Sequence, residues 1–235
     1  MAISIYTLSC FKLPETVIEE IQRAILQFWW GQKRSENRMQ WIRWRISCRL
    51  KMQRGLNFKD LKAFNLAILT KQGWKLVSRP NSLINKVFQS KYYRYSNFLR
   101  AEVGHNPSWD WRSIIEGRKV LKKGILCEVG RRINIRIRED SWVKDYVSIT
   151  PITTTAMTVN LEWVSQLQNS NKTWNQNLIQ TNFNLDIATA ILNTPIHESE
   201  DRVTWMMEKG GDFTVASGYK IAFNFYHPPI EYLPE

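Results

Sequence analysis

Histidine and cysteine, the residue types that most often carry catalysis or hold metal ions, are few and scattered in this sequence. The chain contains His105, His197, His227, Cys10, Cys48 and Cys127. None of them lies at the spacing of a C-x-x-C pair or of an H-E-x-x-H motif. The sequence therefore predicts no metal site and no cofactor. The cysteines are interpreted as buried, reduced thiols of an intracellular protein.

The acidic residues offer one dense cluster, which consists of Glu198, Glu200 and Asp201. Magnesium-dependent nucleases and polymerases need carboxylates that converge on the ion. This cluster follows Pro195 in an expected loop, so we interpret it as a solvated run of charges. The sequence also lacks a Gly-rich phosphate loop and a G-x-S-x-G nucleophile motif. We therefore expect that the chain is not an enzyme, and we assign no catalytic residues.

Positive charge is concentrated in the first 150 residues. These hold 29 basic and 12 acidic residues, whereas residues 151–235 hold four basic and nine acidic ones, for a formal net charge of +12. Contacts between cations and phosphates release counterions, so the basic part is the candidate for binding RNA or DNA. The alternative is a basic surface that serves solubility alone.

Seven basic side chains are the candidates for contacting nucleic acid. They are Lys71, Lys75, Arg79, Arg43, Arg45, Lys91 and Arg94. The first three lie four residues apart on an expected helix, and three cations on one helix face cannot all pair locally. The other four alternate with Trp or Tyr, whose rings can stack on bases. For Trp41 and Trp44 the sequence favours a place in the core, since Trp is mostly buried.

Four helices are expected to position these residues. One spans 14–30, where Pro14 suits the first helical position and Gly31 the stop. A second runs from about Lys59 to Ser78. A third is capped by Asn81 or Ser82, and a fourth begins at Ser108 and ends near Gly124.

After residue 124 the apolar period changes from helix to strand. Ile133, Ile135 and Ile137 alternate with polar residues, which predicts a half-buried strand. A turn at 130–132 would join it to residues 126–129 as a hairpin. Further on, we expect short helices near 161–168 and 185–193, strands at 203–207 and 213–215, and a final helix at about 217–225.

The predicted fold class is mainly α with a small β component (α+β). Residues 1–146 form a basic, Trp-rich helical segment that ends in the hairpin. Residues 147–160 form a connector, and residues 161–235 form an acidic α+β segment. No stretch of about 18 apolar residues occurs, so we expect no membrane span. The choice between nucleus and cytoplasm and the oligomeric state are left open.

Ordered motifs run along nearly the whole chain. They include Gly55-Leu56-x-Phe58-x-Asp60-Leu61, Lys71-Gln72-Gly73-Trp74, Lys91-Tyr92-Tyr93 and Asp140-Ser141-Trp142. In this order the motifs resemble plant LINE-type (non-LTR) retrotransposon polyproteins, in the region after the reverse transcriptase domain. Later, Phe213-Thr214-Val215-x-Ser217-Gly218-Tyr219 resembles the opening of the family's reverse transcriptase zinc-binding domain. The resemblance implies a thumb-like basic helical unit, followed by the start of that zinc-binding module.

The resemblance also implies that catalysis lies elsewhere in the family's polyprotein. Its paired metal-binding aspartates lie upstream of this region, and no Tyr/Phe-x-Asp-Asp motif occurs in this sequence. The Cys and His ligands of its zinc-binding domain lie after the segment that matches 217–225, where this sequence is Pro-rich and lacks them. We therefore expect a truncated copy to which neither polymerase activity nor zinc binding carries over.

Three hypotheses for function remain. The first is a non-catalytic remnant of the polyprotein that binds nucleic acid through its basic part. The second is a structural or interaction fragment without activity of its own, which would expose apolar patches. The third is a residual polymerase or nuclease, which would need Glu198, Glu200 and Asp201 to converge on one point.

Overall fold

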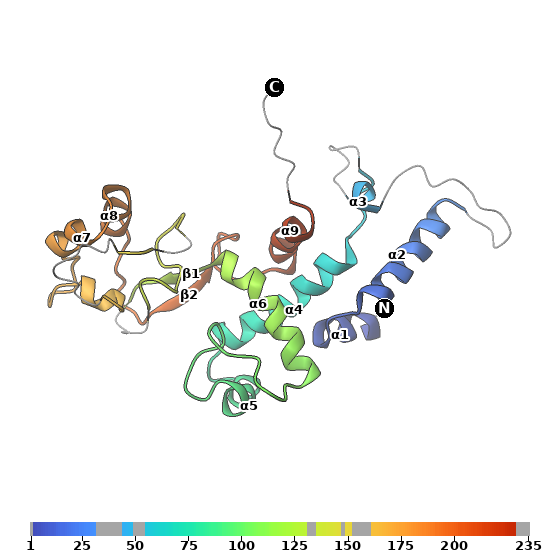
Figure 1. The fold of residues 1–235 in the computed structure, drawn as a ribbon, viewed down its shortest axis with the longest axis horizontal. Coiled ribbons are helices and arrows are strands. Elements are labelled where there is room, and N and C mark those ends of the chain that lie inside the picture. Colours follow the sequence, from blue (N-terminus) through green and yellow to red (C-terminus); the bar gives the residue numbers. More distant parts are fainter. Residues whose placement is uncertain are drawn as a thin grey trace, which may run out of the picture. The chain divides into compact units, whose positions relative to one another are not determined.

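A computed structural model describes residues 2–31, 44–48, 55–130, 135–146, 149–151 and 161–228 (Figure 1). The chain divides into two compact units. Unit 1 comprises Met1–Leu121 and Phe213–Glu235, and unit 2 comprises Lys122–Asp212. The described residues are mostly helical and contain one two-stranded antiparallel sheet, which confirms the predicted fold class.

Unit 1 is built from helices. They are α1 (Ala2–Cys10), α2 (Glu15–Trp29), α3 (Trp44–Ser47), α4 (Leu61–Ser78), α5 (Leu83–Tyr92), the first part of α6 (Trp109–Gly124) and α9 (Val215–Tyr226). The predicted starts of the second and third helices agree with two caps. The Asp60 carboxylate accepts a hydrogen bond from the Ala63 N–H, and the Ser82 hydroxyl accepts one from the Asn85 N–H. Both caps satisfy amide groups at the first helical turn.

The central helix of unit 1 is α4, which contacts α1, α2, α5 and α9 (Figure 1). Close approach between α4 and α6 depends on Gly117, since a Cβ there would lie 2.6 Å from the Thr70 backbone nitrogen. The Thr70 hydroxyl donates to the Gly117 carbonyl at 3.1 Å across this contact. On the side of α1, the Asn65 amide donates to the carbonyls of Leu8 and Phe11. A buried α4 thus holds the surrounding helices in place.

Aromatic rings fill the space between α5 and α6. Trp111 is completely buried, and the Tyr92 ring stacks on it at a centroid distance of 4.5 Å. Phe88, Tyr93 and Phe98 also pack on Trp111, at centroid distances of 5.6, 5.6 and 5.9 Å. We call these five residues the Trp111 ring cluster. Trp74, Trp142 and Trp205 are buried as well, whereas Trp44, for which the sequence favours a place in the core, is half-buried, and Trp41 lies outside the described residues.

Unit 2 combines the small sheet with short helices. Its elements are β1 (Ile125–Glu128), the 3-10 helix η2 (Val164–Leu167), α7 (Gln176–Asn182), α8 (Leu185–Leu192) and β2 (Arg202–Trp205). Strands β1 and β2 pair antiparallel, with Ile125 opposite Trp205. A separate apolar core contains Trp142, Leu167, Ile179, Phe183 and Ile191 among its members. Unit 2 therefore has the core expected of a domain.

The predicted hairpin is wrong in its pairing. Strand β1 pairs with β2, which is far along the sequence, and the predicted turn at 130–132 extends outside the described residues. The segment Ile135–Ile137 pairs with residues 162–164, where the Val164 N–H donates to the Ile135 carbonyl and the Ile137 N–H to the Glu162 carbonyl. The alternation itself is confirmed at Ile135 and Ile137, which are buried, whereas Ile133 lies outside the described residues.

The predicted strand at 213–215 is also wrong. Phe213 and Thr214 precede α9, and the Thr214 hydroxyl caps this helix by accepting from the Ser217 N–H at 3.1 Å. The β-branched residues gave a strand pattern, but the hydroxyl at the cap position stabilises the helix start. Helices α1 and α7 were not predicted, although the Asn175 side chain caps α7 by accepting a hydrogen bond from the Leu178 N–H at 3.1 Å.

The compact units differ from the division that the charge reversal predicts at 147–160. Residues 122–146 pack into the same core as residues 161–212, while α9 packs on α4 in unit 1. Apolar contacts determine which segments form one unit, and the sign of the surface charge does not.

Candidate nucleic-acid interface

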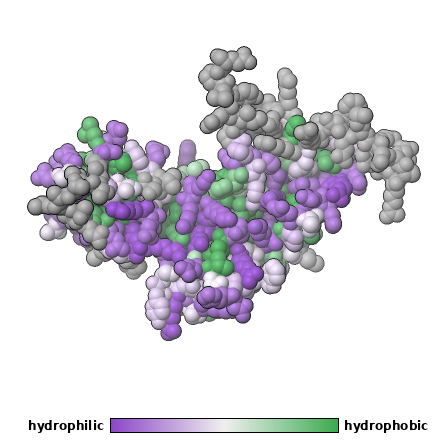
Figure 2. Space-filling model, viewed as in Figure 1, coloured by the Kyte–Doolittle hydropathy of each residue, from purple (hydrophilic) through white to green (hydrophobic). Residues whose placement is uncertain are grey.

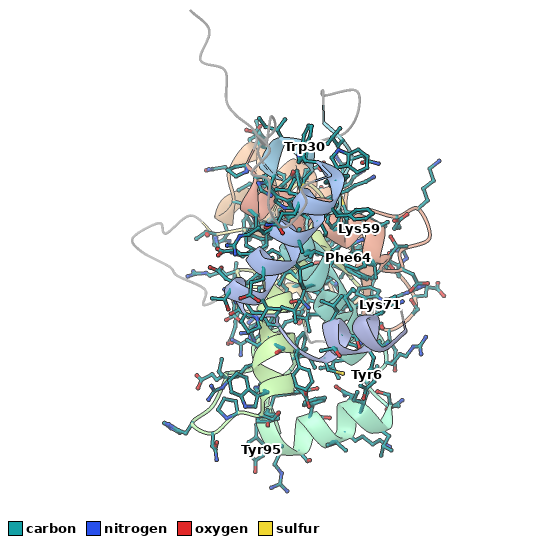
Figure 3. The ribbon with its side chains drawn as sticks, turned by 90° about the vertical axis from the view of Figure 1, so that its right-hand side faces the viewer. Tyr6, Trp30, Lys59, Phe64, Lys71 and Tyr95 are labelled. Atoms are coloured by element: carbon teal, nitrogen blue, oxygen red, sulfur yellow. The ribbon has the colours of Figure 1, made fainter. Side chains whose placement is uncertain are left out.

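The predicted stripe Lys71, Lys75 and Arg79 lies along the second half of α4 and its C-cap. Lys71 is exposed, and the Lys75 ammonium donates to the Gln72 side-chain oxygen at 3.2 Å. Arg79 is exposed and stands at the C-cap, where its backbone leaves the helical conformation. In Figure 3, Lys59, which precedes α4, is followed by Phe64 and Lys71 of α4. The stripe therefore offers two cations on the helix and one just beyond it.

The candidates Arg43 and Arg45 cannot be placed in the same way. Arg43 lies outside the described residues, and of Arg45 only the backbone, in α3, is described.

The aromatic and basic run 91–95, which begins in α5, contains rings that pack in the core and one exposed ring. Tyr92 belongs to the Trp111 ring cluster, and the Lys91 ammonium lies 5.1 Å from the centre of its ring. Tyr95 is 94% exposed, and the Arg94 guanidinium lies 5.9 Å from its ring centre. Exposed rings beside cations can stack on bases while the cation contacts a phosphate. Tyr95 and Arg94 meet this description. The Tyr92 ring does not, because it packs on Trp111 in the core.

A second exposed ring with a cation was missed from the sequence. Trp109 is 75% exposed, and the Arg112 guanidinium lies 5.8 Å from its ring centre. The spacing of Trp109 and Trp111 could have indicated this, because residues two apart on a helix point to different sides. Since Trp111 faces the core, Trp109 must face away from it.

Two hydrogen bonds bring these groups to the same end of unit 1. The Tyr92 hydroxyl lies 3.1 Å from the Ser108 hydroxyl, and the Ser108 N–H donates to the Tyr92 oxygen at 3.0 Å. They fix the end of α5 beside the start of α6. Figure 3 shows Tyr95 at the end of unit 1 opposite Trp30. We define the α5–α6 surface as Lys91, Arg94, Tyr95, Trp109 and Arg112.

Charge favours an anionic partner for unit 1. Unit 1 contains 23 basic and 10 acidic residues, whereas unit 2 contains 10 basic and 11 acidic ones. Glu15 and Glu116 are already paired with Lys12, Lys62 and Lys119. The hydrogen bond from Lys62 and its charge lower the pKa of Glu15, which keeps this carboxylate ionised. The face drawn in Figure 2 accordingly shows mostly hydrophilic side chains over unit 1. A large excess of cations remains for other partners.

A buried polar cluster joins the start of α4 to α9. The Asp60 carboxylate accepts a hydrogen bond from the His227 Nε2 at 3.0 Å, and the Asp60 backbone N–H donates to the Tyr219 hydroxyl oxygen at 2.9 Å. Burial and the charge of Asp60 raise the pKa of the Cys48 thiol to about 12. Since the thiolate is the reactive form, Cys48 is an inert thiol at neutral pH. This cluster is structural and holds no activated nucleophile.

One residue of the acidic cluster near β2, Asp201, has a structural role. The Asp201 carboxylate accepts a hydrogen bond from the Gly130 N–H at 2.8 Å. Across the described ranges, no group of three His, Cys, Asp or Glu side chains could hold a metal ion. Within the same ranges, no helix is both long and apolar enough to cross a membrane.

The described fold defines a mainly helical protein with a basic helical unit and a small antiparallel sheet. The chain belongs to the family of the uncharacterized mitochondrial protein AtMg00310 of Arabidopsis thaliana, to which it is 33% identical over 153 residues. That alignment covers 65% of this chain and 99% of the relative. A second relative is the Arabidopsis thaliana protein named "Putative ribonuclease H protein At1g65750", at 26% identity over 234 residues. This match covers 92% of the chain and 36% of the relative. No family model and no solved structure matches the chain.

Proposed function

We propose that unit 1 binds RNA or DNA through the α5–α6 surface and the stripe Lys71, Lys75 and Arg79. The observation that carries this proposal is the pair of exposed rings, Tyr95 and Trp109, each beside a guanidinium. They lie on a unit with 23 basic and 10 acidic residues. Rings that stack on bases and cations that contact phosphates together form a sequence-tolerant binding surface for single strands.

Affinity for single-stranded RNA or DNA is expected to fall steeply with salt. Replacing Lys71, Lys75 and Arg79 by Ala removes up to three phosphate contacts, so the slope of log K against log salt should fall by about 2. Replacing Tyr95 and Trp109 by Ala should weaken binding by about tenfold or more without changing this slope, because stacking involves no counterion release. Fluorescence anisotropy titrations at several salt concentrations measure both effects.

The matched controls each remove one exposed cation of unit 1 outside the proposed surface, in Arg23→Ala and Lys86→Ala, and Arg112→Ala removes one cation of the α5–α6 surface. Arg23 and Lys86 lie outside the proposed surface, so their variants should retain the wild-type affinity, while Arg112→Ala should lose affinity. A flat salt response, or equal losses from all of these variants, would contradict the proposal.

We further infer that the chain is a non-catalytic remnant of a LINE-type retrotransposon polyprotein. The motifs between Gly55 and Trp74 and the match to a relative named for ribonuclease H support this origin. With Mg²⁺ or Mn²⁺, the purified protein is expected neither to cleave the RNA strand of an RNA–DNA hybrid nor to extend a primer. Metal-dependent product from a preparation that passes size exclusion would overturn the inference.

A second candidate function is protein interaction through α5. Leu83, Ile84 and Val87 are 79%, 46% and 57% exposed, and they lie within one turn of each other. Exposed apolar side chains of this kind mark interaction sites. If this function holds in place of the first, Leu83→Ser and Val87→Ser should reduce self-association in analytical ultracentrifugation, and nucleic-acid binding should be absent.

A further inference from the structure

A groove with a volume of about 530 Å³ opens on unit 2, and its lining is rich in cations. The cations are Lys122, Lys123, Lys144, Arg202 and Lys209. Only three carboxylates, those of Glu128, Asp145 and Glu208, line the same groove. Because unit 2 as a whole has 10 basic and 11 acidic residues, this local excess does not follow from its composition. The fold gathers positive charge at this place.

The sheet provides the floor of the groove. In the antiparallel register, Leu126 lies opposite Thr204 and Glu128 lies opposite Arg202. Directly opposed residues share a face of the sheet, and successive residues alternate between faces. Leu126 and Glu128 are half-buried on the groove side, whereas the intervening Cys127 is buried in the core of unit 2. The floor thus presents Leu126 opposite Thr204, and Arg202 opposite the Glu128 carboxylate.

The turn after β2 forms one wall. The Met206 N–H donates to the Gly124 carbonyl at 2.9 Å, and the Trp205 N–H donates to the Gly211 carbonyl at 2.7 Å. Gly211 closes this turn with a φ of +72°. These bonds hold the segment that carries Lys209 against the sheet. Backbone hydrogen bonds therefore fix the main chain of the turn that carries Lys209, one of the residues that line the groove.

Lys144 approaches the groove from the other wall. It precedes Asp145, whose φ of +70° marks a tight turn, and the Tyr146 N–H donates to the Val143 carbonyl across that turn. The Cys127 N–H donates to the Ser141 carbonyl at 2.7 Å, which ties this segment to β1. Within the part of the chain that is described, Lys144, Arg202 and Lys209 form no ion pair, although three carboxylates line the same groove.

Two methionines add an apolar contact surface. Met206 and Met207 line the groove and are 40% and 51% exposed. Thioether side chains adapt to flat ligands and make favourable contacts with aromatic rings. The volume lies in the range of small-ligand sites, which combine an apolar surface with a few placed polar groups. An anion with a flat apolar group fits this combination.

We propose that the groove binds a nucleotide, whose phosphate contacts Lys144, Arg202 and Lys209 and whose base packs on Met206 and Met207. The nucleotide is either free or part of a single strand, and the two sources share this chemistry. The site lies in unit 2, so the proposal does not rest on the function proposed for unit 1.

Methionine methyl groups report on this groove directly. The full chain carries six methionines, and methyl carbon-13 labelling gives each a separate NMR signal, assigned with Met206→Leu and Met207→Leu. Adenosine monophosphate or a short single-stranded oligonucleotide should shift the signals of Met206 and Met207. A shift with both ligands indicates a free nucleotide, and a shift with the oligonucleotide alone indicates a strand; either result supports the site. Adenosine without phosphate should give a much smaller shift.

Charge variants complete the test. Lys209→Gln and Arg202→Gln should each weaken the ligand response by about tenfold, since each removes one charged contact to phosphate. Lys172→Gln is the matched control, because Lys172 is an exposed lysine of unit 2 outside the groove. The proposal is overturned if no ligand shifts the two signals, if adenosine acts as strongly as its phosphate, or if Lys172→Gln weakens the response as much as Lys209→Gln. The Lys71, Lys75 and Arg79 variant should leave these shifts intact, which separates this site from unit 1.

Discussion

Replacing Trp111 by Ala is expected to lower the free energy of unfolding by about 3–5 kcal/mol. Trp111 is completely buried and contacts Phe88, Tyr92, Tyr93 and Phe98 through its ring. The substitution leaves a cavity that these rings cannot fill, and it removes several aromatic pairs. Since a domain is stable by about 5–15 kcal/mol, unit 1 should be close to unfolding. Urea titrations followed by far-ultraviolet circular dichroism measure the change.

Trp109→Ala is the matched control two residues away. Trp109 is 75% exposed, so its removal should change stability by less than about 0.5 kcal/mol. A second variant, Trp111→Phe, keeps a ring and removes the indole N–H, which is buried without a hydrogen-bond partner among the described residues. Trp111→Phe should lower the free energy of unfolding much less than Trp111→Ala does. If Trp109→Ala and Trp111→Ala shift the urea midpoint equally, the assignment of core and surface on α6 is wrong.

The stability of unit 1 is expected to fall above about pH 9 as three buried groups are forced to ionise. Burial and the charge of Asp60 raise the pKa of Cys48 from 9.0 to about 12. Burial raises the pKa of Tyr93 and of Tyr219 from 10.0 to about 12. A raised pKa in the folded state means that the unfolded chain loses its proton first. The stabilisation is therefore complete below pH 9 and is lost as the pH rises towards 12.

The expected slope is about 1.4 kcal/mol per pH unit for each group above its unfolded pKa. Of these three groups only Cys48 contributes between pH 9 and 10, so Cys48→Ala should reduce the fall in that interval and leave the steeper fall above pH 10. Tyr93→Phe should reduce the fall above pH 10, whereas Tyr95→Phe, at an exposed position, should leave the curve unchanged. Free energies of unfolding measured from pH 8 to pH 11 test this. A flat curve over this range would contradict the burial of these groups.

The two Trp variants also separate stability from binding. Trp109 belongs to the α5–α6 surface, so its loss should weaken nucleic-acid binding in a folded protein. Trp111 only supports that surface, because its stacking with Tyr92 holds the end of α5 at the start of α6. We expect Trp111→Ala to lose binding because it loses the fold, and Trp109→Ala to lose binding while it remains folded. This difference distinguishes the two roles.

The sequence by itself determined the main helices. The expected ranges 14–30 and 59–78 correspond to α2 (Glu15–Trp29) and α4 (Leu61–Ser78), and the expected caps Ser82 and Ser108 stand at the starts of α5 and α6. Such features are local, since a cap and an apolar period involve residues within a few turns. The excess of positive charge in the first half of the chain is likewise a property of composition.

Only the tertiary structure decided what the long-range contacts are. Strand β1 meets β2 across about 75 residues of chain, and the return of α9 to α4 places the last described helix in unit 1. No local pattern encodes a pairing between strands so far apart, because either strand's alternation fits several partners. For the same reason, the sequence named the cations of α4 but not Trp109 with Arg112, nor the groove on unit 2. Exposure and convergence of side chains depend on which faces the packing of the core leaves free.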